Sequence, residues 1–432
     1  MPHARWQARC IAQIRELAGV EIVESGADVL LDLTDQPSSA SHWRFVHGPE
    51  ARLGDAAVRE HLAGDRVVMV RLVAIAADGV ASVLETGVLK CVPHSLGATR
   101  DRVFDTAAAW PARCLRRLSE AALPGERVLL SANPVSPVQK ALVPFASVRN
   151  FLRRRLTAMT EEHWAIGFIP KPVQHVLDRF DAREIRWLEP PAGQVLADPV
   201  SAFVRDGALQ VFAERYDFQD RQGRIVVFDV DARGTASLPR EVLRLPVHAS
   251  YPYLIGHGGA MYCLPEAHAS NRVQLHRATA FPDRWVPDRV LLDGFAGVDP
   301  TVFEHEGRWW LFAGNHADQD ETRLYVFHAD DLFGPWQPHA ANPVKSDIRC
   351  SRPAGPPFRR GGDLFRPAQD CSRTYGGAVA VNRIVALSPT QFREETVAVL
   401  NPDPNGPRAH GLHTLSGAGD FTLVDGKRHQ AR

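Results

Sequence analysis

A pattern that occurs four times in this chain predicts its fold. The four copies are DPVSAFVRDGALQVFAE (198–214), YPYLIGHGGAMYCLPE (251–266), DPTVFEHEGRWWLFAG (299–314) and RPAGPPFRRGGDLFRPAQD (352–370). Each copy begins with a polar or aromatic residue before proline and continues as an apolar strand, a glycine turn and a second apolar strand. Successive X-Pro pairs lie 53, 48 and 53 residues apart. A period of about 40–50 residues with several strands per repeat is typical of propeller blades.

Each copy is followed by a third apolar run, and the chain ends with a further hairpin. The third runs are GRIVVFDVD, NRVQLHRAT, TRLYVFHAD and the weaker AVAVNRIVAL, and the last hairpin is HGLHTLSGAGDFTLVDGK (410–427). Short strands that alternate with Gly, Pro, Asp and Asn turns indicate an all-β domain. We therefore predict a five-bladed β-propeller over residues 191–432.

The first 190 residues mix helical and strand patterns. Trp6–Ala18 has helical spacing, and Asp65–Ile75 and Val83–Val92 read as strands joined by an Asp78-Gly79 turn. We predict an α/β domain over residues 1–115 and a helical linker region over residues 116–190. The fold class expected for the whole chain is thus an α/β N-terminal domain plus an all-β propeller.

The helix predicted for Val148–Met159 carries Arg153, Arg154 and Arg155 in a row. A run of arginines is usually a solvated helix face, but it can also be a phosphate-binding patch. Both interpretations remain open from the sequence.

Composition excludes several classes of protein. The 432 residues include 50 basic and 50 acidic side chains and are 45% hydrophobic, as in an ordinary globular protein. Zero net charge provides no overall field to attract nucleic acid or an anionic membrane, so such contacts would need a local patch. We find no signal-peptide pattern and no apolar run of membrane-spanning length. We expect a cytoplasmic protein without a nucleic-acid partner or a membrane span.

The six cysteines are scattered without a CxxC pair, which favours reduced structural thiols over disulfides or a zinc site. His248 and His413 are expected to be hydrogen-bonded imidazoles and not metal ligands. We therefore predict neither a metal nor a cofactor.

The repeat places polar residues at equivalent positions of different blades. If the X-Pro residues begin the innermost strands, then Asp198, Tyr251, Asp299, Arg352 and a residue near His413 form a ring. The equivalent positions on the second strands are occupied by Glu214, Glu266, Gly314 and Asp370. Carboxylates that converge beside an arginine suit acid–base chemistry or recognition of sugar hydroxyls.

Ordinary structural roles compete with this interpretation. Asp before Pro is a common turn starter, and Glu214 and Glu266 can face solvent at strand ends. Trp309 and Trp310 are expected in the core between blades and not as sugar-stacking platforms, since adjacent strand residues point to opposite faces.

Several ordered motifs resemble a known family. LADPV, HASYPY, YCLPE, GVDPT, WWLFAG, SRPAG, RPAQDCSRTYG and GLHTLSGAGDFTLVDG resemble the propeller region of the glucosamine inositolphosphorylceramide transferase family over about residues 185–427. In plant members of that family the transfer chemistry belongs to a separate glycosyltransferase domain. The resemblance therefore implies a separate glycosyltransferase as a possible partner.

The Asp-Pro blade openings are also similar to those of a clan of five-bladed glycoside hydrolases. The resemblance implies that Asp198 is the general base and that Asp299 tunes the pKa of the acid. Arg352 stands where the clan has its general acid Glu, and a guanidinium cannot donate a proton at neutral pH. Glu266 is our preferred replacement, with Asp370 as a second choice. Arg352 would favour an anionic sugar.

The N-terminal region resembles a trimmed formyltransferase. WRFVHGPEARLGD is similar to that family's catalytic segment, with His47 at the position of the catalytic His. Phe45 stands where the family has Asn, so no side chain would polarise the formyl carbonyl. We interpret this region as a degenerate scaffold, and an active formyltransferase is the third choice of function.

The sequence thus predicts a carbohydrate-active protein that binds and processes a sugar or glycoconjugate, by glycosidase-like or glycosyl-transfer chemistry. The alternative is a non-catalytic glycan-binding module that works with a glycosyltransferase. The predicted catalytic residues are Asp198, Asp299 and Glu266. The predicted substrate-binding residues are Arg352, Glu214, Tyr251, Asp370, His413 and Arg366.

Overall fold

The chain divides into two compact units, Met1–Met159 and Thr160–Arg432. The computed structural model describes residues 2–17, 21–23, 29–33, 41–47, 55–118, 126–128, 134–157, 160–205, 208–231 and 233–431. The first of the two predicted boundaries, 115/116, falls inside the first unit. The second, 190/191, falls inside the second unit, where residues 160–190 form the strands β6 and β7 and two short 3-10 helices, Val173–Leu177 and Ala182–Glu184.

The first unit contains one five-stranded sheet within its described residues, in the order β1-β2-β3-β4-β5. β1 runs parallel to β2, and the other pairs are antiparallel. The elements are α1 (Pro2–Arg15), β1 (Leu31–Asp32), β2 (His42–His47), α2 (Val58–Ala63), β3 (Val67–Ile75), β4 (Ala81–Lys90), α3 (Leu96–Ala107), α4 (Trp110–Leu118), β5 (Arg127–Val128), α5 (Pro137–Ala141) and α6 (Val143–Thr157).

Local sequence explains these elements. Asp78 and Gly79 form the β3–β4 turn, where Gly79 has φ +81° and Asp78 accepts the N–H of Val80 at 3.0 Å. Ser95 caps α3 by accepting the N–H of Ala98 at 3.2 Å. Alternate residues of β3, including Val68, Val70 and Leu72, are buried, as expected of a strand with one face on the core.

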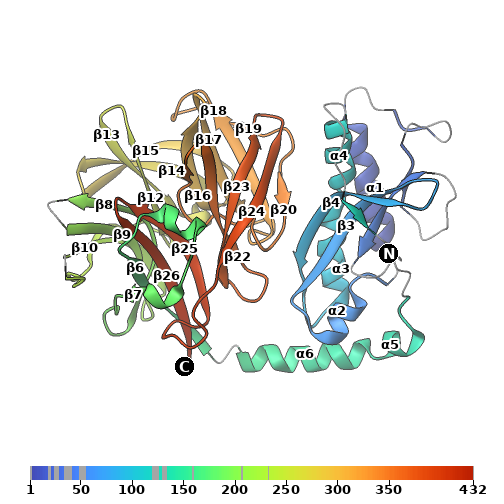
Figure 1. Cartoon of the computed structure of the whole chain (residues 1–432), viewed down its shortest axis with the longest axis horizontal. Helices are drawn as coiled ribbons and strands as arrows, with labels where there is room; N and C mark the ends of the chain where they lie inside the picture. Colours follow the sequence, from blue (N-terminus) through green and yellow to red (C-terminus); the bar gives the residue numbers. More distant parts are fainter. Residues whose placement is uncertain are drawn as a thin grey trace. The chain divides into compact units, whose positions relative to one another are not determined.

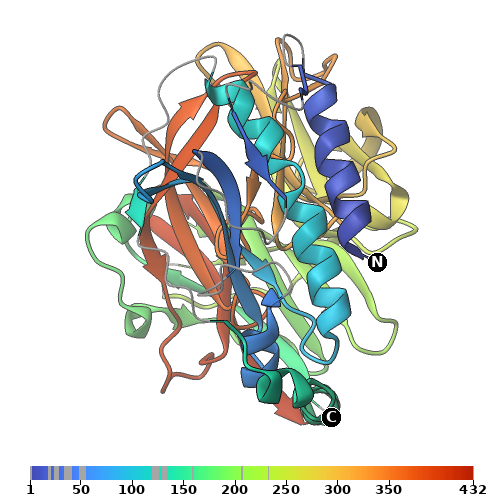
Figure 2. The same ribbon diagram turned by 90° about the vertical axis from the view of Figure 1, so that its right-hand side faces the viewer.

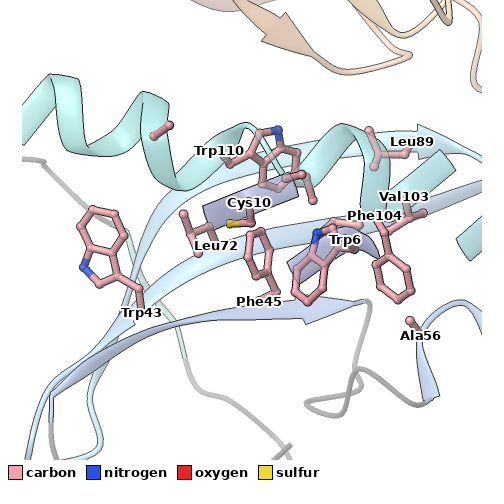
Figure 3. Packing of buried hydrophobic residues seen from close by; sticks show 14 of the residues in the cluster. Trp6, Cys10, Trp43, Phe45, Ala56, Leu72, Leu89, Val103, Phe104 and Trp110 are labelled. Carbon is pink, nitrogen blue, oxygen red and sulfur yellow. The ribbon is translucent and has the colours of Figure 1, made fainter. Parts of the chain in front are cut away.

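The core of the first unit lies between its sheet and the helices α1, α3 and α4, which contact one another or β4 (Figure 2). Aromatic rings fill it: Trp6 lies 5.3 Å from both Phe45 and Phe104, measured between ring centroids. Figure 3 shows these rings beside Cys10, Leu72 and Trp110. All six cysteines of the chain are buried thiols, as predicted.

The resemblance to a formyltransferase depends on residues of this core. Phe45 is buried among the apolar residues, and the His47 ring packs edge-on against Phe104 with a centroid distance of 5.7 Å. Residues 48–54 of the motif lie outside the described residues. The formyltransferase resemblance stays a prediction.

The second unit is all-β and of the propeller type, and its described residues form five sheets (Figure 1). In the order of the sheets their strands are β8 (Gln194–Arg205), β9 (Ala208–Asp217), β10 (Gln222–Val230), β11 (Arg240–Leu243); β12 (Ser250–His257), β13 (Ala260–Glu266), β14 (Arg272–Ala280), β15 (Arg284–Asp293); β16 (Gly297–His305), β17 (Arg308–Asn315), β18 (Arg323–Ala329), β19 (Gln337–Pro338), β20 (Lys345–Ser346); β21 (Phe358–Arg360), β22 (Asp363–Asp370), β23 (Ala378–Leu387), β24 (Phe392–Leu400); and β25 (Gly411–Ala418), β26 (Phe421–Ala431), β6 (Thr160–Ile169), β7 (Arg186–Trp187).

Each of the first three repeats forms one sheet, in which the first three strands are those that the repeat predicts. The fourth repeat differs, because its first strand begins at Phe358 and not at Arg352, where only an isolated bridge joins Pro353 to Ala368. The predicted core role of the tryptophans is confirmed. Trp310 is 2% exposed, and Trp309 packs against a buried apolar cluster that includes Tyr253, Leu264 and Leu311.

The fifth sheet joins the two ends of the unit. β6 pairs with β26 from Thr160 opposite Ala431 to Ile169 opposite Thr422. Ile166 of β6 is fully buried in a cluster with Leu423 of β26 and Leu196 of β8. The strand that begins the unit is therefore part of its core and not a linker.

This arrangement predicts the effect of truncating Ile166. We expect Ile166→Ala to lower the free energy of unfolding by about 2–5 kcal/mol, since it leaves a cavity in a closed core. Val204 of β8, which is 53% exposed, provides the control. Val204→Ala should change the free energy of unfolding by less than about 1 kcal/mol. Urea unfolding of both variants measures this, and equal effects would contradict the place of β6 in the core.

Candidate functional site

Backbone bulges position the candidate residues. Asp198, Tyr251 and Asp299 have left-handed φ values of 55°, 48° and 49°, and each lies where the pairing of its strand with the next one shifts. A fourth shift lies at the equivalent place in β25, between Leu412 and Leu415, beside His413. A non-glycine residue in this conformation costs about 1–3 kcal/mol, so neighbouring contacts must hold it.

Carboxylates of neighbouring sheets hold these bulges. The N–H of Asp198 donates to Asp425 Oδ2 at 2.8 Å, and the N–H of Tyr251 donates to Asp198 Oδ2 at 3.1 Å. The N–H of Asp299 donates to Glu266 Oε2 at 3.0 Å. Two acids that the repeat predicts, Asp198 and Glu266, and one that it does not, Asp425, therefore connect one sheet to the next.

A pocket of about 250 Å³ lies at these bulges. Residues of β6, β8, β9, β12, β13, β16 and β25 line it, together with residues from the segments beside these strands and beside β22. The lining consists of Glu162, Trp164, Val195, Ala197, Asp198, Glu214, Tyr216, Phe218, His248, Ser250, Glu266, Asp299, Arg352, Tyr375 and His413.

His413 bridges two aspartates in the pocket. Its Nε2 lies 3.1 Å from Asp198 Oδ1, and its Nδ1 lies 2.7 Å from Asp425 Oδ1. Burial alone would lower the pKa of His413, but Asp425 and Asp198 outweigh burial and raise that pKa to about 10. Burial would raise the pKa of Asp425, but the charge of His413 and its hydrogen bond lower that pKa. At neutral pH His413 is therefore an imidazolium held between two carboxylates.

Within the described part of the chain, one group of side chains has the geometry to hold a metal ion: Asp198, His413 and Asp425. Their oxygen and nitrogen ligand atoms all lie within 4.8 Å of one another. A His ligand must offer a neutral ring nitrogen. Both ring nitrogens of His413 face carboxylates, so a cation would have to displace its proton.

Arg352 is surrounded by acids. Its Nε donates to Asp299 Oδ2 at 2.6 Å, and its Nη groups lie 3.8 Å from Glu266 Oε2 and 3.4 Å from Asp320 Oδ2. Burial raises the pKa of Asp299, while the guanidinium opposes that rise. Gln369 donates a further hydrogen bond to Asp299 Oδ2 at 2.9 Å. The charge of Arg352 is thus compensated within the protein.

Glu266 and Glu214 occupy equivalent strand positions but have opposite pKa shifts. Burial would raise the pKa of Glu266, yet the hydrogen bond from His268, at 2.9 Å, and the Arg352 charge lower it to about 2. Burial raises the pKa of Glu214, whose Oε1 lies 3.1 Å from His248 Nε2, and this contact only partly offsets the rise. Glu214 therefore holds a proton more readily than Glu266 does.

Aromatic rings complete one wall of the pocket. The Trp164 ring lies 4.1 Å from the His413 ring between centroids, and the Arg352 guanidinium lies 5.0 Å from the centre of the Tyr375 ring. Lys427 Nζ, buried behind them, lies 2.6 Å from Glu162 Oε1. This wall is apolar on its face and neutralised by ion pairing behind it.

The structure brings six of the nine predicted site residues to this pocket: Asp198, Glu214, Glu266, Asp299, Arg352 and His413.

The other three predicted residues do not line the pocket, which corrects the prediction. The Tyr251 side chain is fully buried, with its hydroxyl 2.8 Å from Thr301 Oγ1, because its ring packs parallel to Tyr253 in the core. Arg366 is buried against Glu394 at 2.6 Å. Asp370 accepts the N–H of Ser372 at 2.9 Å and so caps a turn.

Sequence reasoning gave no site role to Trp164, Glu162, Tyr375, His248 or Asp425. Asp425 lies in the recognised last hairpin, where its place beside His413 is a cross-strand relation. Trp164 and Glu162 lie in the segment predicted as linker, and nothing local shows that this segment pairs with the end of the chain.

The geometry defines an all-β unit of the propeller type with acids, an arginine and a histidine gathered in one pocket. Comparison with known proteins is more specific. The profile of the family described as "Glucosamine inositolphosphorylceramide transferase 1, N-terminal" matches residues 189–413, just over half of the chain. The chain belongs to this family, and the resemblance seen in the sequence is confirmed.

The curated relatives are plant proteins. Glucosamine inositolphosphorylceramide transferase 1 of Oryza sativa subsp. japonica is 31% identical over 248 residues, which are 54% of this chain and 33% of the relative. The protein of the same name from Arabidopsis thaliana is 30% identical over 248 residues, 54% of this chain and 32% of the relative. The chain thus spans about a third of the length of these relatives.

Solved structures with a similar fold include glycoside hydrolases. A family 117 glycoside hydrolase from Zobellia galactanivorans matches with a TM-score of 0.41 and 12% identity, over 61% of this chain and 90% of that chain. The GH43_1 enzyme from Xanthomonas citri matches with a TM-score of 0.38 and 16% identity, over 54% of this chain and 87% of that chain.

The pKa of His413 predicts how stability depends on pH. A histidine whose pKa rises on folding from about 6.5 stabilises the folded state below that value, and this contribution is lost as pH rises through about 10. The difference in unfolding free energy between wild type and His413→Gln should therefore shrink between pH 7 and 10, at about 1.4 kcal/mol per pH unit.

Urea unfolding at a series of pH values measures this difference. His339 is the matched control, because burial lowers its pKa to about 4. His339→Gln should leave the alkaline slope unchanged. An unchanged slope in His413→Gln would contradict the imidazolium.

Proposed function

We propose that the unit Thr160–Arg432 closes into a five-bladed propeller whose central pocket binds and processes a sugar or glycoconjugate. Contacts between neighbouring sheets support closure. β8 contacts both β25 and β12, β12 contacts β16, and β22 contacts β25. Gln369 of β22 connects the fourth sheet to the third by its hydrogen bond to Asp299 Oδ2. The pocket then lies on the axis of the wheel, where the equivalent strands converge.

One observation carries the sugar assignment: Asp198, Glu214, Glu266 and Asp299 from three sheets meet in one pocket. Carboxylates are strong acceptors for sugar hydroxyls, and aromatic rings such as Trp164 and Tyr375 suit the apolar faces of a sugar. A pocket of about 250 Å³ is smaller than the ~300–1,000 Å³ of typical ligand sites, which suits a single sugar ring. The curated relatives carry the name glucosamine inositolphosphorylceramide transferase 1.

The proposed chemistry uses one acid and one base. Glu214, whose pKa is raised, protonates the oxygen of the leaving group, and Asp198 accepts the proton of the attacking water or hydroxyl. His413 fixes Asp198, and Arg352 fixes Asp299 beside the sugar. Glu266 was our preferred donor, but a carboxyl with a pKa of about 2 is ionised at neutral pH and cannot donate. Glu214 takes this role instead.

The charge of the pocket indicates a neutral or amino sugar. Arg352 suggested an anionic ligand, but Asp299, Glu266 and Asp320 surround its guanidinium. His413 likewise lies between two aspartates. Both cations are therefore already paired with acids, so an anionic sugar would find little free positive charge in the pocket. The name of the curated relatives includes an amino sugar, glucosamine.

A binding module is the second candidate. The matching family describes an N-terminal region, and the chain spans about a third of the relatives. Both oxygens of Asp198 already accept hydrogen bonds or pair with His413, which suits a rigid recognition surface as well as a base. Such a module would bind the same sugar and work with a separate glycosyltransferase.

Substitution of the acid and the base distinguishes these candidates. On plain and activated glycosides, we expect Glu214→Gln and Asp198→Asn each to reduce turnover by at least about 100-fold, since a general acid or base contributes about 10²–10⁴. Glu214→Gln should also remove the fall in rate that follows when rising pH takes the proton from Glu214. The exposed Asp420 and Glu395 supply controls, and Asp420→Asn and Glu395→Gln should leave turnover unchanged.

The outcomes separate the two roles. Turnover that survives in both site variants contradicts the catalytic assignment. Sugar binding by the wild type without any turnover supports the module, and no binding of any sugar overturns the whole proposal.

Ligand charge gives a separate prediction. By calorimetry, methyl glycosides of glucosamine and glucose should bind more tightly than that of glucuronic acid, by at least about tenfold or ~1.4 kcal/mol. The difference should shrink as salt rises, because it is electrostatic. Tighter binding of the glucuronide would restore Arg352 as an anion receptor and refute this part of the proposal.

A further inference from the structure

Helix α6 packs on the rest of the first unit by one polar side. Asn150 is 4% exposed and donates from Nδ2 to the carbonyls of His61 at 3.0 Å and Pro93 at 2.7 Å. Ser147 Oγ lies 2.8 Å from His61 Nε2. The side of α6 that packs on α2 is therefore held by hydrogen bonds.

The opposite side of α6 is apolar and open to solvent. Phe145, Val148 and Leu152 are 73%, 61% and 57% exposed, and their spacing of three and four residues puts them on one face. Val138 and Leu142, from α5 and the turn after it, are 70% and 48% exposed. A helix on the surface of a water-soluble unit normally has the reverse arrangement, with its apolar stripe on the core.

Cationic side chains accompany this apolar face. Residues 128–160 contain no acidic residue, while α5 and α6 carry Lys140, Arg149, Arg153, Arg154 and Arg155. Lys140 pairs with Asp55 at 2.6 Å, and Arg149 and Arg154 contact the carbonyl of Leu62 and the ring of His94, so Arg153 and Arg155 are the cations relevant to a ligand of this face. The Arg155 guanidinium lies 5.3 Å from the centre of the Phe151 ring. Because the whole chain has zero net charge, this segment is a local basic patch.

We propose that the outer face of α5 and α6 binds the surface of an anionic lipid bilayer. An apolar stripe flanked by arginines without acids is the composition of helices that lie in the headgroup layer, where apolar side chains enter the acyl boundary and cations meet lipid phosphates. A nucleic acid would use the arginines but leave Phe145, Val148 and Leu152 in water. A second copy of the chain would bring an identical positive face, which repels it.

This binding is peripheral. Within the described residues no helix is long and apolar enough to cross a membrane. The proposal does not depend on the sugar pocket, which lies in the other unit.

Vesicle co-sedimentation of the full chain tests the proposal. We expect the wild type to bind vesicles of phosphatidylcholine mixed with phosphatidylserine at least about tenfold more tightly than phosphatidylcholine alone, and less tightly as salt rises. The double substitution of Phe145→Gln with Leu152→Gln should abolish this binding. Arg153→Gln and Arg155→Gln should each weaken it by about fivefold.

The matched control removes two exposed apolar residues elsewhere. Val397 and Val399 of β24 are each 47% exposed, and Val397→Gln with Val399→Gln should leave vesicle binding unchanged. Circular dichroism confirms that each variant is folded. Equal binding to both kinds of vesicle, or no binding, overturns the proposal. So does concentration-dependent dimerisation that the Phe145 and Leu152 variants abolish, since the face would then belong to a second copy.

Discussion

The second unit depends on one kind of interaction. The backbone N–H of a residue in left-handed conformation donates to a carboxylate of the neighbouring sheet. Asp198 donates to Asp425, Tyr251 to Asp198, and Asp299 to Glu266. Without these acids three strained backbone positions would also leave buried donors unsatisfied, at a cost of about 1–3 kcal/mol each. The acids that align the sheets are therefore the same acids that give the pocket its chemistry.

Burial makes this dual role possible only if the charges are paired. An isolated carboxylate in such a site would take up a proton, whereas a paired one stays ionised at the cost of fixed partners. His413 between two aspartates and Arg352 beside Glu266 are such pairs. They hold the acids rigid, which suits a site that must present oxygens at fixed positions to a sugar. They also leave little positive charge free for a ligand.

The repeat predicts much of this arrangement, because each feature it encodes is local. The X-Pro positions locate the bulges at Asp198, Tyr251 and Asp299, and counting from the turn glycines locates Glu214 and Glu266. What escapes prediction depends on relations between distant segments. Trp164 reaches the pocket because β6 pairs with β26, more than 250 residues further along the chain. Arg352 suggested an anionic ligand for the same reason, since its neutralising partners come from other sheets.

The contrast between Glu214 and Glu266 follows from a single departure within the repeat. Each glutamate lies across the strand pair from the residue that precedes a left-handed position. Glu214 is opposite Ala197, and Glu266 is opposite Ser250. At the junction of the first two sheets, Asp198 accepts the N–H of Tyr251, so Glu214 is not needed there. At the next junction the equivalent residue is Tyr251, which has no carboxylate, and Glu266 must accept the N–H of Asp299 in its place. That contact, with His268 and Arg352, keeps the pKa of Glu266 low, whereas burial raises that of Glu214. One tyrosine in place of an aspartate thus decides which glutamate is structural and which can carry a proton.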